Sequence, residues 1–157
     1  MVSEEMARAA ARWWREKIDG GAHHDNGDSS QEGILAGVMA DSLNEPTDGH
    51  ALDLFEKILA LRLLEEGENA RDYISIGSDY GPEGCLLDSA LETGITPHNF
   101  PWKTWMWIFE DRIEVRDGYR APNVVIWPAQ DGQEEPAEPD GQEEPAEPDG
   151  RDEQEGQ

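Results

Sequence analysis

The sequence predicts an α+β fold in which three N-terminal helices pack on a small, mostly antiparallel sheet with one further short helix. Two observations support this class. Before Arg71, apolar residues recur at helical spacing, whereas between residues 73 and 127 they alternate with polar ones over short runs. Gly and Pro separate those short runs, as expected for turns between strands. We expect residues 1–128 to form a single domain.

Three helices are predicted before Arg71. Ser3 can cap the first, which ends at Gly20-Gly21. The pattern Ser29-x-x-Glu32 is typical of a capping box and opens the second helix. Thr47 can cap the third and strongest helix, which is expected to end before Gly67. The second helix carries five large apolar residues, Ile34, Leu35, Val38, Met39 and Leu43.

The second half of the domain is predicted to supply the sheet. In order it contains strand 73–76, helix 86–91, strand 103–109, strand 112–117 and a last strand over 123–127. Gly94 is placed to end the short helix in a left-handed conformation. Alternation turns Ile113 and Val115 inward. The strand over 103–109 is apolar on both faces, so we expect Trp105 and Trp107 to serve mainly in packing.

Negative charge is distributed very unevenly along the chain, whose formal net charge is −24. Between Ile18 and Glu56 there are nine acidic residues and no Lys or Arg. The unit DGQEEPAEP at 131–139 is repeated at 140–148, and we expect residues 129–157 to form a disordered acidic tail. So acidic a chain does not favour direct binding to a phosphate backbone. It favours basic protein partners, nucleic-acid mimicry or solubility.

Other sequence features bear on the compartment. Cys85 is the only cysteine, so no internal disulfide can form, as in a reducing cytosol. The N-terminus has charges threaded through it and lacks the apolar core of a secretory signal. No run approaches the ~18 apolar residues needed to span a bilayer. We therefore expect a protein of the cytoplasm that has no contact with a membrane.

Two clusters could carry chemistry. Residues 23–28, HHDNGD, are the densest group of potential metal ligands, but few further histidines are available to complete a site, and a polar loop that caps the next helix is the favoured interpretation. Cys85 lies at a predicted helix N-terminus, where a thiolate would be favoured, with His50 or His98 as possible bases. Its alternative role is a small buried apolar residue. We predict no catalytic residue, no metal and no cofactor.

Aromatic and basic residues are interleaved between residues 100 and 127. This mixture is typical of interface hot spots and of base-stacking sites. The predicted binding residues of this segment are Trp102, Lys103, Arg116, Tyr119 and Arg120. The acidic stretch contributes Asp41, Glu45 and Asp48 as predicted contacts to a basic partner.

Four short strings occur together in this chain. They are DNGD at 25–28, DYGP at 79–82, FPWKT at 100–104 and GYRAP at 118–122. With them the segment 8–127 resembles small, poorly characterised accessory proteins encoded on phages and conjugative elements of gut Firmicutes. The last string usually reads GYGAP there, so Arg120 replaces a glycine. The resemblance implies a mobile-element setting, where small acidic proteins often inhibit host defence, and it implies no known reaction.

The sequence therefore favours a non-enzymatic mobile-element protein that inhibits a host anti-phage defence system by binding a basic protein surface. One alternative is a small-ligand binder that sequesters a nucleotide signal, with Lys103, Arg116 and Arg120 on its phosphate. The other is a metal-dependent hydrolase that uses the loop 23–28. The sequence leaves the oligomeric state open.

Overall fold

The computed structural model describes residues 1–25 and 27–129, and it confirms the predicted α+β class. The predicted tail lies outside these residues, except for Ala129. The elements are, in order, α1 (Glu4–Asp19), α2 (Gln31–Asp41), α3 (Gly49–Asn69), β1 (Ile74–Ser78), α4 (Gly84–Thr93), the 3₁₀ turn η1 (Pro97–Asn99), β2 (Thr104–Ile108), β3 (Ile113–Asp117) and β4 (Val124–Trp127).

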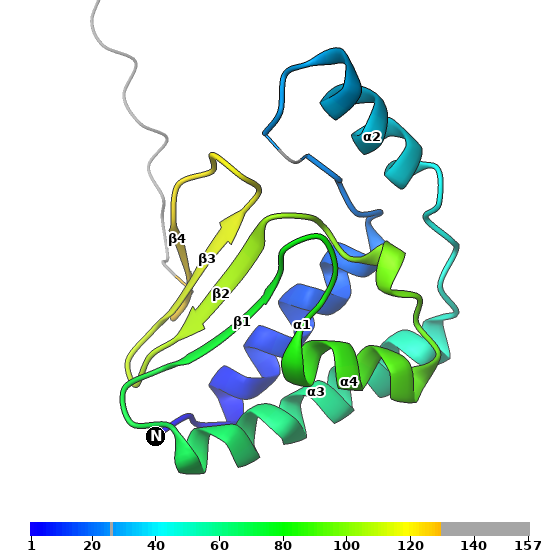
Figure 1. Ribbon diagram of the computed structural model, residues 1–157. Helices are drawn as coiled ribbons and strands as arrows, with labels where there is room; N and C mark the ends of the chain where they lie inside the picture. Colours follow the sequence, from blue (N-terminus) through cyan, green and yellow to red (C-terminus); the bar gives the residue numbers. More distant parts are fainter. Residues whose placement is uncertain (26, 130–157) are drawn as a thin grey trace, which may run out of the picture.

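The four strands form one antiparallel sheet in the order β1-β2-β3-β4. Its two faces differ in what covers them. Helices α1 and α3 run side by side behind one face, which we call the inner face, and α4 lies next to α3 and β1 (Figure 1). The inner face of β2 is fully buried and consists of Thr104, Met106 and Ile108. Ile113 and Val115 of β3 are buried beside them, as predicted.

The core between the helices and the sheet is centred on three aromatic rings. Phe100 follows η1, and its ring centroid lies 6.3 Å from that of Trp14 and 5.8 Å from that of Phe55. All three side chains are completely buried. The residue that joins η1 to β2 therefore ties α1 and α3 to the sheet.

The helix boundaries differ from the predicted ones in small but explicable ways. Ser3 caps α1 as predicted, since its Oγ accepts from the backbone N–H of Met6. Ser30, not Ser29, caps α2. Asp48, not Thr47, precedes α3, because the Thr47 hydroxyl accepts a hydrogen bond from Asn99 instead. Gly94 ends α4 with a φ of 72°, in the left-handed region that glycine tolerates.

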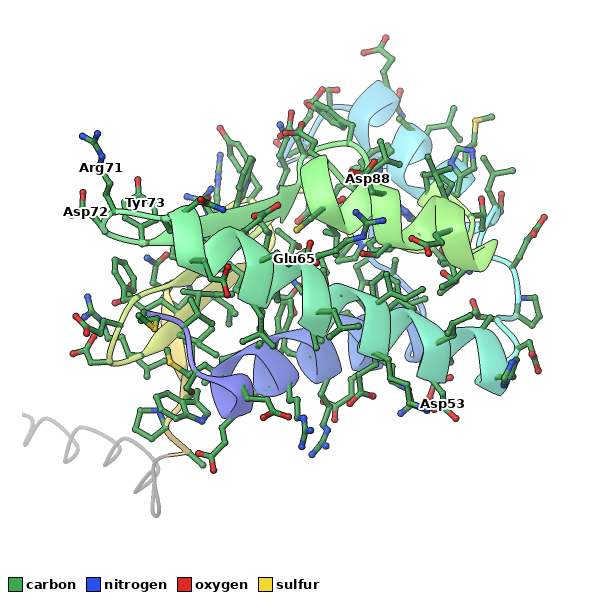
Figure 2. The ribbon with its side chains drawn as sticks, turned by 90° about the horizontal axis from the view of Figure 1, so that it is seen from below. Asp53, Glu65, Arg71, Asp72, Tyr73 and Asp88 are labelled. Atoms are coloured by element: carbon green, nitrogen blue, oxygen red, sulfur yellow. The ribbon has the colours of Figure 1, made fainter. Side chains whose placement is uncertain are left out.

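Helix α3 does not end before Gly67 but continues to Asn69. Gly67 is buried against Val2, and a Cβ added there would lie 2.9 Å from the Val2 Cβ. The glycine therefore allows the ends of two helices to approach and does not mark a stop. Beyond it, Arg71, Asp72 and Tyr73 project from the turn that leads into β1, far from Asp53 in the first half of α3 (Figure 2).

Helix α2 stands apart from the sheet on which the three predicted helices were expected to pack (Figure 1). Only Gly33 and Ala40 are buried in it. The four large apolar residues of α2 and Leu43, which follows it, are each more than half exposed, at 57% for Ile34, 59% for Leu35 and Val38, 61% for Met39 and 53% for Leu43. The spacing of these residues predicted a helix correctly, but their side chains do not belong to the hydrophobic core.

The other face of the sheet, which we call the outer face, differs from the prediction as well. We expected both faces of the predicted strand 103–109 to be covered and Trp105 and Trp107 to serve mainly in packing. Both side chains are only partly buried, because they alternate with the inner residues and no described helix lies over them.

Within the described ranges, no helix has the length and hydropathy needed to cross a bilayer.

Candidate functional site

The segments that contain the four short strings lie side by side at one end of the sheet. The loop 79–82 meets the segment 100–104, where the N–H of Lys103 donates to the Asp79 carbonyl at 2.7 Å. The Trp102 ring packs edge-on against Tyr80, with 5.2 Å between centroids. Trp102 also donates its N–H to the carbonyl of His23, just before the first string. Residues separated by up to 80 positions thus form one cluster.

Lys103 acts as a brace in this cluster. Its φ of 55° lies in the left-handed region, and it is the one non-glycine residue with positive φ in the described part of the chain. Its Nζ donates to Asp79 Oδ1 at 2.5 Å and lies 4.0 Å from the Tyr80 ring centroid. The hydrogen bond to Asp79 raises the pKa of the Lys103 ammonium. The ammonium group of Lys103, which was predicted to bind a ligand, is therefore already paired with Asp79 of the same chain.

His24 is the buried centre of the cluster, whereas the sequence had placed it only among the potential metal ligands of residues 23–28. Its side chain is 1% exposed. The ring Nδ1 lies 2.7 Å from Asp41 Oδ1, and Nε2 lies 2.9 Å from the carbonyl oxygen of His98. The imidazole also packs edge-on against Trp102, with 5.0 Å between centroids. Since both ring nitrogens face oxygen acceptors, His24 joins α2, the segment before β2 and its own loop.

Asp41 consequently has an internal partner, unlike the other two acids predicted to contact a partner. Its Oδ1 accepts from the backbone N–H of His24 as well as facing the ring. Glu45 and Asp48 are exposed, and the side chain of Asp48 makes no capping hydrogen bond to α3. Asp41 therefore positions α2, whereas Glu45 and Asp48 can meet a partner without loss of a structural contact.

A second polar contact holds the chain after α2. Asn99, which is 3% exposed, accepts from the Glu45 N–H at 2.9 Å and donates to the Glu45 carbonyl at 2.8 Å. The Asn44 side-chain amide donates to the carbonyl of Ala22 at 3.0 Å. Helix α2 is thus held at its C-terminal end by His24, Asn44 and Asn99. Nothing in local sequence distinguishes such buried polar residues from loop residues.

Tyr119 and Arg120 belong to the string at 118–122, and Tyr119 lies next to the string at 25–28. The Tyr119 ring occupies the space beside Gly27, where an added Cβ would come within 2.1 Å of it. Arg120 is exposed near the Tyr119 ring, and its φ is not positive, so the missing glycine of the string is not required here. Arg116 lies elsewhere, on the outer face of β3 beside Trp107. The predicted basic residues therefore do not converge on one anion.

The loop 23–28 offers little for metal binding in this arrangement. Both nitrogens of His24 are engaged, and Asp25 and Asp28 accept hydrogen bonds from the N–H groups of Gly27 and Ser30. Those bonds shape the turn before α2, and the bond from Ser30 lowers the pKa of Asp28. Among the residues that the structure describes, no group of three or more His, Cys, Asp or Glu side chains could hold a metal ion.

Cys85 is a small buried residue at the start of α4. Burial, with a smaller contribution from the nearby Glu66 carboxylate, raises the pKa of its thiol from 9.0 to about 12. The thiolate fraction at pH 8 should therefore be about a thousandfold below that of an ordinary cysteine. Such a thiol does not suit covalent catalysis.

We expect iodoacetamide at pH 8 to label Cys85 slowly in the native protein and rapidly in guanidinium chloride, measured by mass spectrometry. Because the folded pKa lies above the unfolded value, the thiol stabilises the fold below about pH 9 and that contribution is lost as the pH rises toward 12. Equal labelling rates in the native and denatured protein would contradict the burial.

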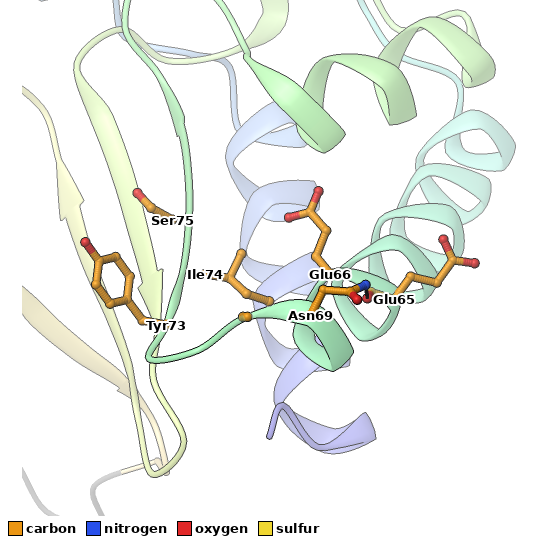
Figure 3. A pocket seen from close by; sticks show the side chains of 7 residues that line it. Glu65, Glu66, Asn69, Tyr73, Ile74 and Ser75 are labelled. Carbon is orange, nitrogen blue, oxygen red and sulfur yellow. Dashed lines mark hydrogen bonds between the residues drawn. The ribbon is translucent and has the colours of Figure 1, made fainter.

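A hollow of about 460 Å³ lies between the end of α3 and the edge strand β1. Figure 3 shows Glu66 extending into the gap beside Ile74, with Asn69 below it and Tyr73 at the turn. Its charged side chains are Glu65 and Glu66, so it does not suit the phosphate of a nucleotide.

In comparisons with known proteins, no protein-family model matches this chain and no curated protein is significantly similar to it.

Proposed function

We propose that this chain is a non-enzymatic binding protein that occupies a basic surface of a partner protein. We further propose that it is an accessory protein of a mobile element, such as a phage, and inhibits a host anti-phage defence system in the bacterial cytoplasm. The observation that carries the binding proposal is the acidic arm, which we define as residues 25 and 27–48: helix α2 with the exposed apolar residues and the carboxylates beside it.

The apolar part of the arm is larger than solubility alone would allow. Ile34, Leu35, Val38 and Met39 succeed one another at spacings of one and three positions, so they form a band along α2, and Leu43 follows just after the helix. Contiguous exposed apolar patches bordered by polar groups are typical of protein interaction sites. Burying each aliphatic side chain in a partner would contribute about 1.5–3 kcal/mol before the cost of association.

The charges beside this band all have one sign. Asp53 and Glu56 of α3 are paired with Arg15, so their charge is largely neutralised inside the domain. Within the described ranges, four acids of the arm make no ion pair, namely Asp25, Glu32, Glu45 and Asp48, and no Lys or Arg lies in the arm to neutralise them. A partner surface with an apolar centre and Lys or Arg at its rim complements this arrangement in both respects.

The contacts of His24 and Asn99 support the same function, because they hold the arm in place before it binds. A preformed arm loses less conformational entropy on association than a flexible one. The His24 nitrogens are engaged within the fold and the Cys85 thiol is held protonated, so neither of these two side chains is placed for catalysis.

Two variants of the tagged full chain test the proposal by capture from a lysate of the host bacterium and quantitative mass spectrometry. The pair Ile34→Ser and Val38→Ser, made together, should reduce capture of the specific partner at least about tenfold, the equivalent of ~1.4 kcal/mol. Reversal of Glu32, Glu45 and Asp48 to Lys should reduce it comparably and remove its sensitivity to salt. Both variants should keep the melting temperature of the wild type, since these side chains are exposed.

Leu61→Ser is the matched control, because Leu61 is 62% exposed on α3 and lies outside the arm. It should leave capture unchanged. Undiminished capture by both arm variants would refute the arm as the binding surface. Release of a nucleotide from the denatured protein would instead favour a small-ligand binder.

A further inference from the structure

The outer face of the sheet presents a second interaction surface, separate from the acidic arm. Strand β2 contributes Trp105 and Trp107 to it, and the residues directly opposite on β1 are Gly77 and Ser75. Trp105 lies across Gly77, where an added Cβ would come within 2.3 Å of its ring. The small residues of β1 thus allow the indole of Trp105 to lie across the sheet and present an aromatic layer.

The same layer extends to the end of the hairpin. Phe109 lies next to Tyr73, with 5.5 Å between ring centroids, and the Arg112 guanidinium lies 4.2 Å from the Phe109 centroid. Tyr73 is 51% exposed. Four aromatic side chains, two from β2 and one each from the turns before β1 and after β2, are therefore at least partly accessible on a face that no described helix covers.

The charges on this face balance, unlike those of the rest of the domain. Residues 111–116 contribute two arginines, Arg112 and Arg116, and two acids, Asp111 and Glu114. The acids at either end of this segment, Glu110 and Asp117, are paired with the N-terminal amine and with Lys17. Arg112 is paired with both acids, at 2.9 Å to Asp111 and 2.6 Å to Glu114. Arg116 makes no ion pair within the described residues, its Nε has no hydrogen-bond partner, and its guanidinium lies 5.8 Å from the Trp107 ring centroid.

We propose that the outer face is the interface of a homodimer, in which the sheets of two copies pack face to face. A two-fold interface brings a patch onto itself, so the patch must be self-complementary. The outer face meets this requirement, because it is apolar at Trp105 and Trp107 and its arginines and carboxylates are equal in number. Arg116 of each copy can then pair with Glu114 of the other, a carboxylate that lies two residues away on the same strand and already accepts from Arg112 of its own chain.

The acidic arm does not meet the requirement. A two-fold contact through α2 would bring Glu32, Glu45 and Asp48 against their own copies with no base to neutralise them. A basic partner does not suit the outer face either. Arg116 would repel its Lys and Arg side chains, and both acids of residues 111–116 are already paired with Arg112. The two surfaces therefore take different occupants, a second copy on the sheet and a basic protein on the arm.

Sedimentation equilibrium of the full chain between about 1 and 100 μM tests the dimer, in a range where a Kd of micromolar order is visible. The expected mass approaches twice 17.5 kDa as concentration rises. Because two chains of charge −24 repel each other, the dimer should tighten as salt is raised. Capture of a basic partner should instead weaken with salt, so the two proposals fail independently.

Ser75→Glu is the decisive variant, because Ser75 is exposed opposite Trp107 and takes no part in the core. It should weaken association at least about tenfold by placing an unpaired charge in the buried layer. Trp107→Thr should do the same by removing aromatic area while keeping a residue that favours strands. Val38→Ser in the arm is the control and should leave the dimer unchanged. A monomer at every concentration, or a dimer indifferent to both sheet variants, would overturn the proposal.

Discussion

Replacing Phe100 with alanine should lower the free energy of unfolding by about 3–5 kcal/mol, a large part of the total stability of a domain of this size. The ring is completely buried between Trp14 and Phe55, so its removal leaves a cavity where two helices meet the sheet. Chemical denaturation followed by circular dichroism measures the loss. The variant should be partly unfolded at 37 °C.

Trp107→Ala provides the comparison for this experiment. The residue is larger than Phe100, but it is partly exposed on the outer face, so we expect a smaller loss, of about 2 kcal/mol, in the monomer. The sequence had predicted core packing for it. Equal losses for the two variants would mean that the outer face is covered in solution even at concentrations where the protein is a monomer, contrary to the arrangement described here.

His24→Ala should release the acidic arm and cost about 2–4 kcal/mol, because it removes a buried ring together with its hydrogen bonds. The Asp41 carboxylate and the His98 carbonyl would both lose their imidazole contact, and Trp102 would lose its packing partner. Hydrogen–deuterium exchange followed by mass spectrometry should show α2 exchanging faster than α1 and α3. Partner capture should weaken with it, since the arm is no longer preformed.

Asp41→Asn is the matched control. The amide keeps an oxygen that can accept from the His24 N–H, so the arm should stay attached and α2 should exchange almost as in the wild type. If His24→Ala left exchange in α2 unchanged, the imidazole would not be the contact that holds the arm.

Local pattern determined much of this protein. The order of the elements, the cap at Ser3, the left-handed glycine after α4 and the inward side chains of β3 follow from the interactions of neighbouring residues, which the sequence contains directly. The uneven charge is also a property of the sequence alone. The lack of Lys and Arg between Ile18 and Glu56 excludes a phosphate-binding footprint there, whatever the fold.

The tertiary structure decided which apolar residues are buried. Helix α2 has the apolar content of a core helix, yet its core-like residues are exposed because His24 and Asn99 hold its C-terminal end away from the sheet. Trp105 and Trp107 alternate with Met106, and only the position of the helices decides which side is covered. Periodicity shows that a face is apolar, but whether another surface covers it depends on contacts between residues far apart in sequence.

The convergence of the four short strings is likewise a tertiary result. Lys103 was predicted to bind a ligand, and its spacing from Asp79 in sequence gave no sign that the two would pair across β1 and β2. Glu45 and Asp48 are exposed, as a contact to a partner would require, whereas Asp41 is held by a histidine 17 positions earlier. Sequence determines which charges are present, and the fold determines which of them remain unpaired, because pairing depends on distances that only the folded chain sets.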